Sequence, residues 1–330
     1  MFEITFSVLL GYLVGSVSFS RIVLRLKSPG RDISDLAIEV GGTDESEPVS
    51  IYGANAASMI LGAKYGIAIG VLDMLKAALP MIVTKFYIFP GQFHYLLVSI
   101  GALLGHNWPL YHRFRGGRGF SIIFGSFIVI DWFGAIVEPV LGILLGMFVA
   151  GNPMIAYVIW LWFLPIWFWF RLSWGTAQFL IAYSLVVTSV FMIATRPEIK
   201  MATNYMKAGR LENYREAMYE SSPRWRGMKR MQDWINELGR ARYAIGFIVL
   251  AVTILVLISL SHLPPWLTPS YPLTKCKAIY QEGQTGYALR QYTLSERRSS
   301  PISSPSILND CARARERAPG CIQPVLAHMG

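Results

Sequence analysis

Cysteine is scarce and confined to the C-terminal end of the chain. Only Cys276, Cys311 and Cys321 occur, so the first 275 residues hold none. This distribution excludes a disulfide framework and a thiolate nucleophile in that part of the protein. The three cysteines also lack the paired spacing of metal ligands. We expect neither a metal nor a cofactor.

Charged residues are also few, at 15% of the chain, whereas a typical soluble domain has about 25%. Hydrophobic residues make up 53%, and the mean hydropathy is +0.41. These values exclude a disordered or collagen-like chain and disfavour an ordinary soluble enzyme. The net charge of +10 alone fits nucleic-acid binding, but that function does not explain the apolar content. We expect membrane lipid, and no nucleic acid, as a partner.

Several familiar catalytic signatures are missing. No histidine is followed five positions later by Asp, because Ser99, Tyr111 and Gly117 stand five positions after His94, His106 and His112. The chain has no G-x-S-x-G and no H-E-x-x-H sequence. Catalysis by a His–Asp pair, a serine elbow or a zinc-binding helix is therefore not expected.

Long apolar segments predict an all-α, polytopic integral membrane protein. Seven segments form the expected core within 1–200: about 4–26, 65–86, 93–107, 119–130, 133–150, 153–170 and 174–194. The first is expected to be retained as a helix. A basic cytoplasmic segment follows at 201–242, with an amphipathic helix over Asn204 to Met218, and then an additional transmembrane helix at 243–263. Residues 264–330, rich in Ser, Pro and Arg, are expected to be disordered.

The positive-inside rule predicts the orientation. With the N-terminus outside, the inside loops carry Lys27, Arg31, Lys64, Arg113, Arg115, Arg118 and the 11 basic residues of 195–242. The outside connections of the first seven spans carry only Lys85 and Arg171. We expect the protein in the plasma membrane, with the loops that bind anions on the cytoplasmic side.

The segment 105–119 is the most informative part of the sequence. Arg113, Arg115 and Arg118 alternate with Gly116, Gly117 and Gly119 just before an expected helix. Glycines let backbone N–H groups approach an anion, a helix N-terminus adds partial positive charge, and arginine binds phosphate in a fork. The segment predicts a phosphate site. The alternative is a turn that contacts anionic lipid headgroups, which explains the arginines but not the glycine spacing.

Polar residues inside the apolar segments are further candidates. Asp73 and Lys76 lie three residues apart on one helical face, where ionisable groups usually mark function. The alternative is a mutually satisfied pair. Ser16 follows Gly11 and Gly15, which form a small-residue packing pattern. His106 is interpreted first as a structural hydrogen-bonding residue.

Two further groups of residues are interpreted structurally. Asp131 and Glu138 have no evident partner in the sequence. The five tryptophans between 160 and 174 are expected to be aromatic anchors at the membrane interface.

Three motifs together resemble the PlsY-type glycerol-3-phosphate acyltransferases. The opening G-Y-L-x-G-S of that family resembles Gly11 to Ser16, and its L-D-x-L-K resembles Leu72 to Lys76. Its G-H-x-x-P followed by F-K-G-G-K-G resembles Gly105 to Pro109 and Phe114 to Gly119, with arginine in place of both lysines. The resemblance covers about residues 4–200.

The resemblance implies a seven-helix membrane enzyme whose site faces the cytoplasm. It implies transfer of a fatty acyl group from the co-substrate acyl phosphate to glycerol 3-phosphate, giving lysophosphatidic acid, by orientation of two phosphorylated substrates. The expected catalytic residues are Ser16, Lys76, His106 and Arg118. The expected phosphate-binding residues are Ser50, Gly53, Asn55, Arg113, Arg115, Gly116, Gly117 and Gly119.

The chain departs from the family pattern in its second motif, G-S-G-N-x-G-A-T-N-x-x-R. Ser50, Gly53 and Ala54 match, but Ile51, Ala56 and Met59 replace two asparagines and an arginine. Each lost charge-assisted hydrogen bond costs about 1.5–3 kcal/mol of binding. We expect replacements from Asn55, Lys64 or the basic segment after Arg196. Two alternatives therefore remain: a catalytically altered relative that binds phospholipid or acyl phosphate, and a membrane transporter.

Overall fold

The computed structural model describes residues 1–40, 46–49, 52–171 and 174–261. Ser50, Ile51 and the segment 262–330, with its three cysteines and the predicted disordered tail, lie outside the described residues. The described part is almost entirely helical, with a single two-stranded sheet. The predicted all-α membrane fold is confirmed.

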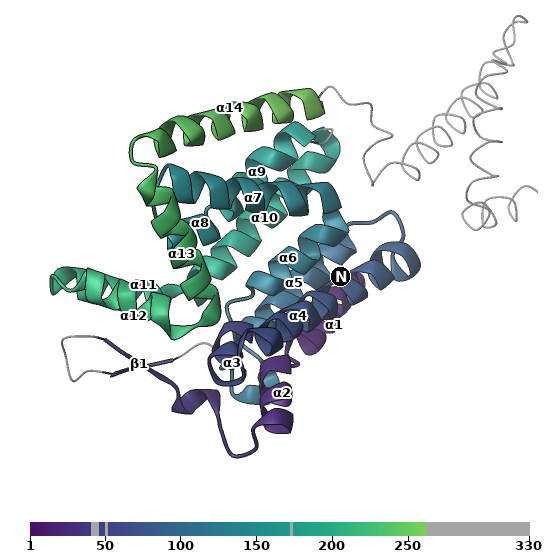
Figure 1. The fold of residues 1–330 in the computed structure, drawn as a ribbon. Helices are drawn as coiled ribbons and strands as arrows, with labels where there is room; N and C mark the ends of the chain where they lie inside the picture. Colours follow the sequence, from purple (N-terminus) through teal and green to yellow (C-terminus); the bar gives the residue numbers. More distant parts are fainter. Residues whose placement is uncertain (41–45, 50–51, 172–173, 262–330) are drawn as a thin grey trace, which may run out of the picture. The chain divides into compact units, whose positions relative to one another are not determined.

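The first helix packs against a second glycine-rich helix from farther along the chain (Figure 1). Helix α1 (Phe2–Gly15) lies along α5 (His94–Asn107). A Cβ atom at Gly11 or Gly15 would overlap the backbone of Val98 or Ala102, and one at Gly105 would overlap the carbonyl of Tyr12. The small residues therefore permit close backbone approach, as in other membrane helix pairs.

The expected first span corresponds to Phe2–Lys27 and consists of two helices. Helix α1 ends at Gly15, and α2 (Phe19–Lys27) begins after the turn that contains Ser16, Val17 and Ser18. The backbone N–H of Val17 donates to the carbonyl of Val14, which tightens this end of the helix. The break exposes backbone and hydroxyl groups beside α4 (Ala63–Val83), where Asp73 and Lys76 lie.

The remaining apolar helices complete the core. They are α6 (Phe120–Ile130), α7 (Trp132–Phe148), α8 (Pro153–Val158), α9 (Trp160–Arg171) and α10 (Trp174–Ala194). Trp160 and Trp167 are each 1% exposed and belong to the central hydrophobic cluster. The prediction of interfacial anchors is therefore wrong for these two residues, although Trp162 and Trp169 are exposed.

Asp131 has clear partners, contrary to the sequence interpretation. Its Oδ1 accepts the N–H of Gly134 at 3.2 Å and so caps α7, and its Oδ2 accepts the indole N–H of Trp167 at 2.8 Å. The Nε atom of Arg171 lies 3.5 Å from the same Oδ2. Trp167 and Arg171 are distant from Asp131 in sequence, which is why the sequence alone did not reveal these two partners. Glu138 is buried on the same helix.

The polar segments fold into a small layer of their own. The η1 turn (Ile33–Asp35) precedes β1 (Ala37–Glu39), which pairs antiparallel with β2 (Ser46–Pro48). Helices α11 (Arg196–Lys207) and α12 (Leu211–Ser221) pack against this hairpin through Val40, Tyr205 and Tyr214. The hydroxyl of Tyr205 donates to Glu47 Oε1 at 3.0 Å. The predicted single helix over Asn204 to Met218 is wrong, because Gly209, at φ 69°, turns the chain between α11 and α12.

The last described elements are α13 (Pro223–Glu237) and α14 (Ala241–Ser261), which meet at 109°. Within the described residues, four helices are long and apolar enough to cross a membrane: Phe2–Lys27, Ala63–Ile88, Pro153–Arg171 and Thr176–Ala194. The second of these includes the π-helical turn η2 (Thr84–Ile88). The bent α13–α14 pair raises the number to five, and α6 and α7 are shorter. The number of crossings, seven plus one, stays a prediction.

Candidate functional site

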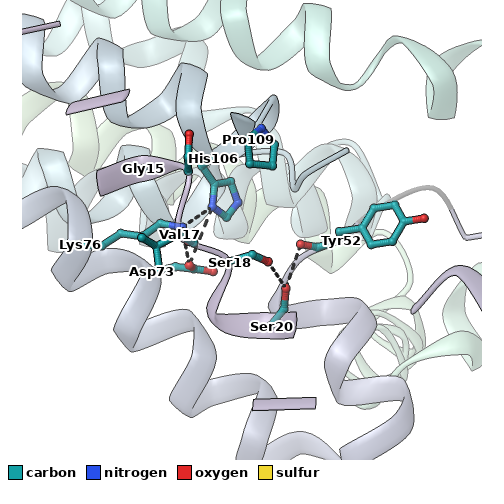
Figure 2. A pocket seen from close by; sticks show the side chains of 10 residues that line it. Gly15, Val17, Ser18, Ser20, Tyr52, Asp73, Lys76, His106 and Pro109 are labelled. Atoms are coloured by element: carbon teal, nitrogen blue, oxygen red, sulfur yellow. Dashed lines mark hydrogen bonds and ion pairs between the residues drawn. The ribbon is translucent and has the colours of Figure 1, made fainter. Parts of the chain in front are cut away.

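Three separate motifs meet at one small pocket (Figure 2). Its walls come from the break between α1 and α2, the middle of α4, the end of α5 and Tyr52. The lining residues are Gly15, Ser16, Val17, Ser18, Ser20, Tyr52, Asp73, Lys76, His106 and Pro109. The pocket therefore unites three predicted catalytic residues: Ser16, Lys76 and His106.

Lys76 is held from three sides. Its Nζ lies 2.9 Å from Asp73 Oδ1, donates to the Val17 carbonyl at 2.6 Å and lies 3.0 Å from His106 Nδ1. The side chains of Asp73 and Lys76 are each 3% exposed. The Val17 carbonyl is available because α1 ends just before it. The helix break thus supplies an acceptor that an uninterrupted helix would use internally.

The contact with Lys76 sets the proton position on His106. Because an ammonium group only donates, we assign Nδ1 as the acceptor and place the ring proton on Nε2. The Nε2 side of the ring lies against Gly117, where an added Cβ would overlap it. His106 therefore orients Lys76 and supports the glycine-rich loop. This arrangement agrees with the structural interpretation of His106.

Ser16 joins the pocket to the loop after α5. Its hydroxyl donates to the Tyr12 carbonyl at 2.8 Å and lies 3.4 Å from the backbone N–H of Leu110. The Tyr12 hydroxyl donates to the Trp108 carbonyl at 2.9 Å. Ser16 therefore holds the α1 terminus against the segment that leads into the loop.

The glycines of the loop pack against His106. The N–H of Gly117 donates to the His106 carbonyl at 3.1 Å, and a Cβ at Gly116 would overlap that carbonyl. In this structure the Gly117 amide is thus used within the protein. Gly119 precedes α6 with φ 78°, and the loop turns at Arg113 and Phe114, which have φ of 52° and 60°. Such left-handed conformations in non-glycine residues are strained and occur at functional sites.

The three arginines of the loop occupy different environments. Arg113 and Arg115 are exposed. Arg118 is partly buried: its Nε donates to Glu198 Oε2 at 3.0 Å, and its Nη2 pairs with Glu198 Oε1. Glu198 lies in the first turn of α11, far along the chain. The sequence analysis did not anticipate this partner, because ion pairing between distant segments leaves no local pattern.

The second motif is packed mainly by apolar contacts. Gly53 precedes α3 (Ala54–Leu61), and Asn55 lies in its first turn with its Oδ1 buried and without a hydrogen-bond partner in the described residues. Ala56, at the position of a family asparagine, is 1% exposed in a cluster with Leu24 and Tyr52. Lys64, an expected replacement, is exposed at the start of α4.

Arg21 is a residue that the sequence analysis missed as a site candidate. Its Nη2 donates to the Arg115 carbonyl at 2.9 Å, and its guanidinium lies 4.3 Å from the centre of the Tyr52 ring. The one available signal was its position five residues after Ser16, as the third residue of α2.

A match to a family model shows which known proteins the chain is related to. The model described as "Glycerol-3-phosphate acyltransferase" matches residues 5–205, which include all of the pocket and Glu198. The chain belongs to the glycerol-3-phosphate acyltransferase family. Helices α12 to α14 lie beyond the matched residues. The family supports acyltransferase activity in a membrane protein.

Individual relatives span nearly the same part. The chain is 30% identical over 190 residues to "Glycerol-3-phosphate acyltransferase 1" of Oceanobacillus iheyensis, covering 56% of this chain and 84% of that protein. It is 30% identical over 183 residues to the Pasteurella multocida protein of that type, covering 55% and 81%. The crystal structure of PlsY in its glycerol 3-phosphate form is 22% identical, covers 63% of this chain and 93% of that chain, and has a TM-score of 0.49.

Proposed function

We propose that the protein transfers a fatty acyl group from acyl phosphate to the sn-1 hydroxyl of glycerol 3-phosphate. The products are lysophosphatidic acid and inorganic phosphate. One observation carries the proposal: Ser16, Lys76 and His106, from three distant motifs, meet in one pocket next to the arginine-bearing loop. Family membership supports the acyl acceptor, and the resemblance of the motifs supports the acyl donor.

The reaction needs no protein nucleophile. The sn-1 oxygen bonds to the carbonyl carbon of acyl phosphate, the bond from that carbon to the phosphate oxygen breaks, and the hydroxyl proton passes to the departing phosphate. The absence of cysteine from the first 275 residues and the internal hydrogen bonds of Ser16 and His106 fit such a direct transfer. Holding two reactants in line contributes about 7–11 kcal/mol to lowering the barrier.

The protein's share of the chemistry is positioning and charge. Lys76 presents a fixed cation at the pocket wall, because Asp73 and His106 restrict its ammonium group. Arg113, Arg115 and Arg118 supply guanidinium groups for the two phosphates, which they bind bidentately. We place this pocket at the cytoplasmic face of the plasma membrane, with the N-terminus outside, because the loops around it carry the basic residues.

The first test is an acyl-transfer assay on membranes with labelled glycerol 3-phosphate and acyl phosphate. We expect labelled lysophosphatidate from the wild type and at least 100-fold less from Arg118→Ala, since Arg118 stabilises developing negative charge. Arg230→Ala, which removes an exposed arginine of α13, is the matched control and should retain wild-type activity. A well-folded wild-type protein that forms no product with acyl phosphate contradicts the proposal.

Two observations favour a second candidate, a relative that binds phospholipid or acyl phosphate without transferring the acyl group. Arg118 is engaged by Glu198, and Ala56 contributes only apolar packing where the family has an asparagine. For this function we expect saturable binding of acyl phosphate to the purified protein without lysophosphatidate formation. Turnover of the bound acyl phosphate in the presence of glycerol 3-phosphate excludes it.

A further inference from the structure

Three arginines and one histidine lie at the edge of the pocket, outside the residues that line it. We name Arg21, Arg25, His112 and Arg115 the rim cluster. Arg25 follows Arg21 by about one turn of α2, Arg21 donates to the Arg115 carbonyl at 2.9 Å, and His112 precedes Arg115 in the same loop. Like charges gathered in this way repel one another unless an anion lies among them.

The carboxylate with an electrostatic effect on Arg21 already forms hydrogen bonds to another residue. Asp32 is the carboxylate that acts electrostatically on Arg21. Its Oδ1 accepts the backbone N–H of Ser34 at 2.9 Å and the Ser34 hydroxyl at 3.0 Å, and it caps the η1 turn. These hydrogen bonds hold the pKa of Asp32 below its usual range. Among the described residues, no carboxylate forms an ion pair with Arg21 within 4.0 Å.

Two contacts hold the guanidinium of Arg21 in place and leave some of its N–H donors available to a ligand. The Tyr52 ring lies 4.3 Å from it and supports one face, and the Arg115 carbonyl takes one Nη2 hydrogen at 2.9 Å. The Nε atom is buried and has no hydrogen-bond partner within the described part of the chain. A buried N–H without a partner is costly, so such a donor usually awaits a ligand or water. The remaining donors form the planar fork that fits a phosphate group.

The position of Arg21 connects it to the pocket through its neighbours. Ser20, the preceding residue, lines the pocket and donates to the Tyr52 carbonyl at 3.0 Å (Figure 2). The Tyr52 N–H donates to the Gly116 carbonyl at 3.0 Å, within the glycine-rich loop. Arg21 therefore sits where α2, the second motif and the loop are joined.

We propose that Arg21 is a substrate-binding residue that takes a phosphate group at the rim of the pocket, together with Arg115. This proposal rests on the proposed function for the identity of the phosphate, which belongs either to glycerol 3-phosphate or to acyl phosphate. The phosphate neutralises the rim cluster. In its absence, burial and the neighbouring cations Arg21, Arg25 and Lys76 keep the pKa of His112 below its usual range, so His112 stays neutral at pH 7.

The test separates binding from folding by comparing substitutions at one position. Arg21→Gln keeps an amide N–H for the Arg115 carbonyl but removes the charge, Arg21→Lys keeps the charge, and Lys27→Ala removes an exposed charge from the same helix. The probes are radiolabelled inorganic phosphate and glycerol 3-phosphate, whose binding to the purified protein in detergent is measured by equilibrium dialysis. Steady-state kinetics with each substrate varied in turn accompanies the binding measurement.

We expect Arg21→Gln to weaken phosphate binding about tenfold, which corresponds to about 1.4 kcal/mol. Arg21→Lys should recover part of this loss, and Lys27→Ala should bind as the wild type does. A rise in the KM for glycerol 3-phosphate alone assigns the group to the acceptor, and a rise in the KM for acyl phosphate alone assigns it to the donor. In each case kcat should change less than KM.

Two results overturn the proposal. One is a folded Arg21→Gln variant with wild-type phosphate affinity and wild-type KM for both substrates. The other is a lower thermal stability of Arg21→Gln with unchanged affinity, which assigns Arg21 a purely structural role. A wild-type protein that forms no lysophosphatidate but binds phosphate in an Arg21-dependent manner contradicts the proposed function and leaves this inference standing.

Discussion

The buried pair of Asp73 and Lys76 predicts which of two single substitutions lowers the stability of the protein more. Both side chains are 3% exposed, so removing one partner leaves an uncompensated polar or charged group inside the protein. Lys76→Met leaves Asp73 with His106 Nδ1 as its remaining close neighbour, at 3.8 Å. Asp73→Asn leaves Lys76 with two acceptors, Val17 O at 2.6 Å and His106 Nδ1 at 3.0 Å. Lys76→Met should therefore be the more damaging change.

The magnitude follows from the burial. Breaking a buried pair from one side costs about 3–5 kcal/mol. For a domain of this size, 1 kcal/mol corresponds to about 2–4 °C in Tm, so Lys76→Met should lower Tm by about 6–20 °C. Asp73→Asn should lower it by less. The double variant Asp73→Asn/Lys76→Met buries no charge and should be more stable than Lys76→Met alone.

The assay is thermal unfolding in detergent, followed by intrinsic tryptophan fluorescence, with Lys64→Met as the control because Lys64 is exposed at the start of the same helix. Acyl transfer is measured on the same preparations. The double variant should regain stability but stay inactive, since the ammonium group is gone. A Lys76→Met variant with wild-type Tm, or a double variant less stable than it, would refute the coupling of this pair.

Two further predictions concern contacts outside the ion pair. Gly117→Ala should lower acyl transfer at least tenfold, as measured by initial rates, because the added Cβ overlaps the His106 ring; wild-type rates in that variant contradict the described packing. Trp167→Phe should lower the free energy of unfolding by about 1–3 kcal/mol, because Asp131 Oδ2 loses a buried donor, while KM for glycerol 3-phosphate stays unchanged. A chemical denaturation series and a substrate titration check this second prediction, and a change in KM without loss of stability contradicts it.

The sequence predicted the helical membrane fold because long apolar segments and glycine spacing are local properties. The convergence of Ser16, Lys76 and His106 followed only from the resemblance of three motifs, since no spacing rule places residues 60 or 90 positions apart at one pocket. The break after Gly15 was not predicted, because the apolar pattern continues through it. That break supplies the Val17 carbonyl that Lys76 uses.

Most of the contacts that could not be predicted from the sequence join residues that lie far apart in the chain. Arg118 pairs with Glu198, Asp131 with Arg171 and Trp167, and Arg21 with the Arg115 carbonyl. Each contact depends on how whole helices pack. The tryptophan interpretation failed for the same reason: Trp160 and Trp167 differ from Trp162 and Trp169 only in the helix face that meets the core.

The hydrogen bond from the Tyr52 N–H to the Gly116 carbonyl has a consequence for sequence divergence. Main-chain atoms are the same in every non-proline residue, so this link between the second motif and the loop places almost no demand on the side chains it joins. Substitutions can therefore accumulate around residues 51–59 while the loop stays anchored. A family member can in this way lose residues of the second motif and still keep the fold of this region. Matching the motif residues is therefore a stricter criterion for family membership than similarity of the backbone geometry.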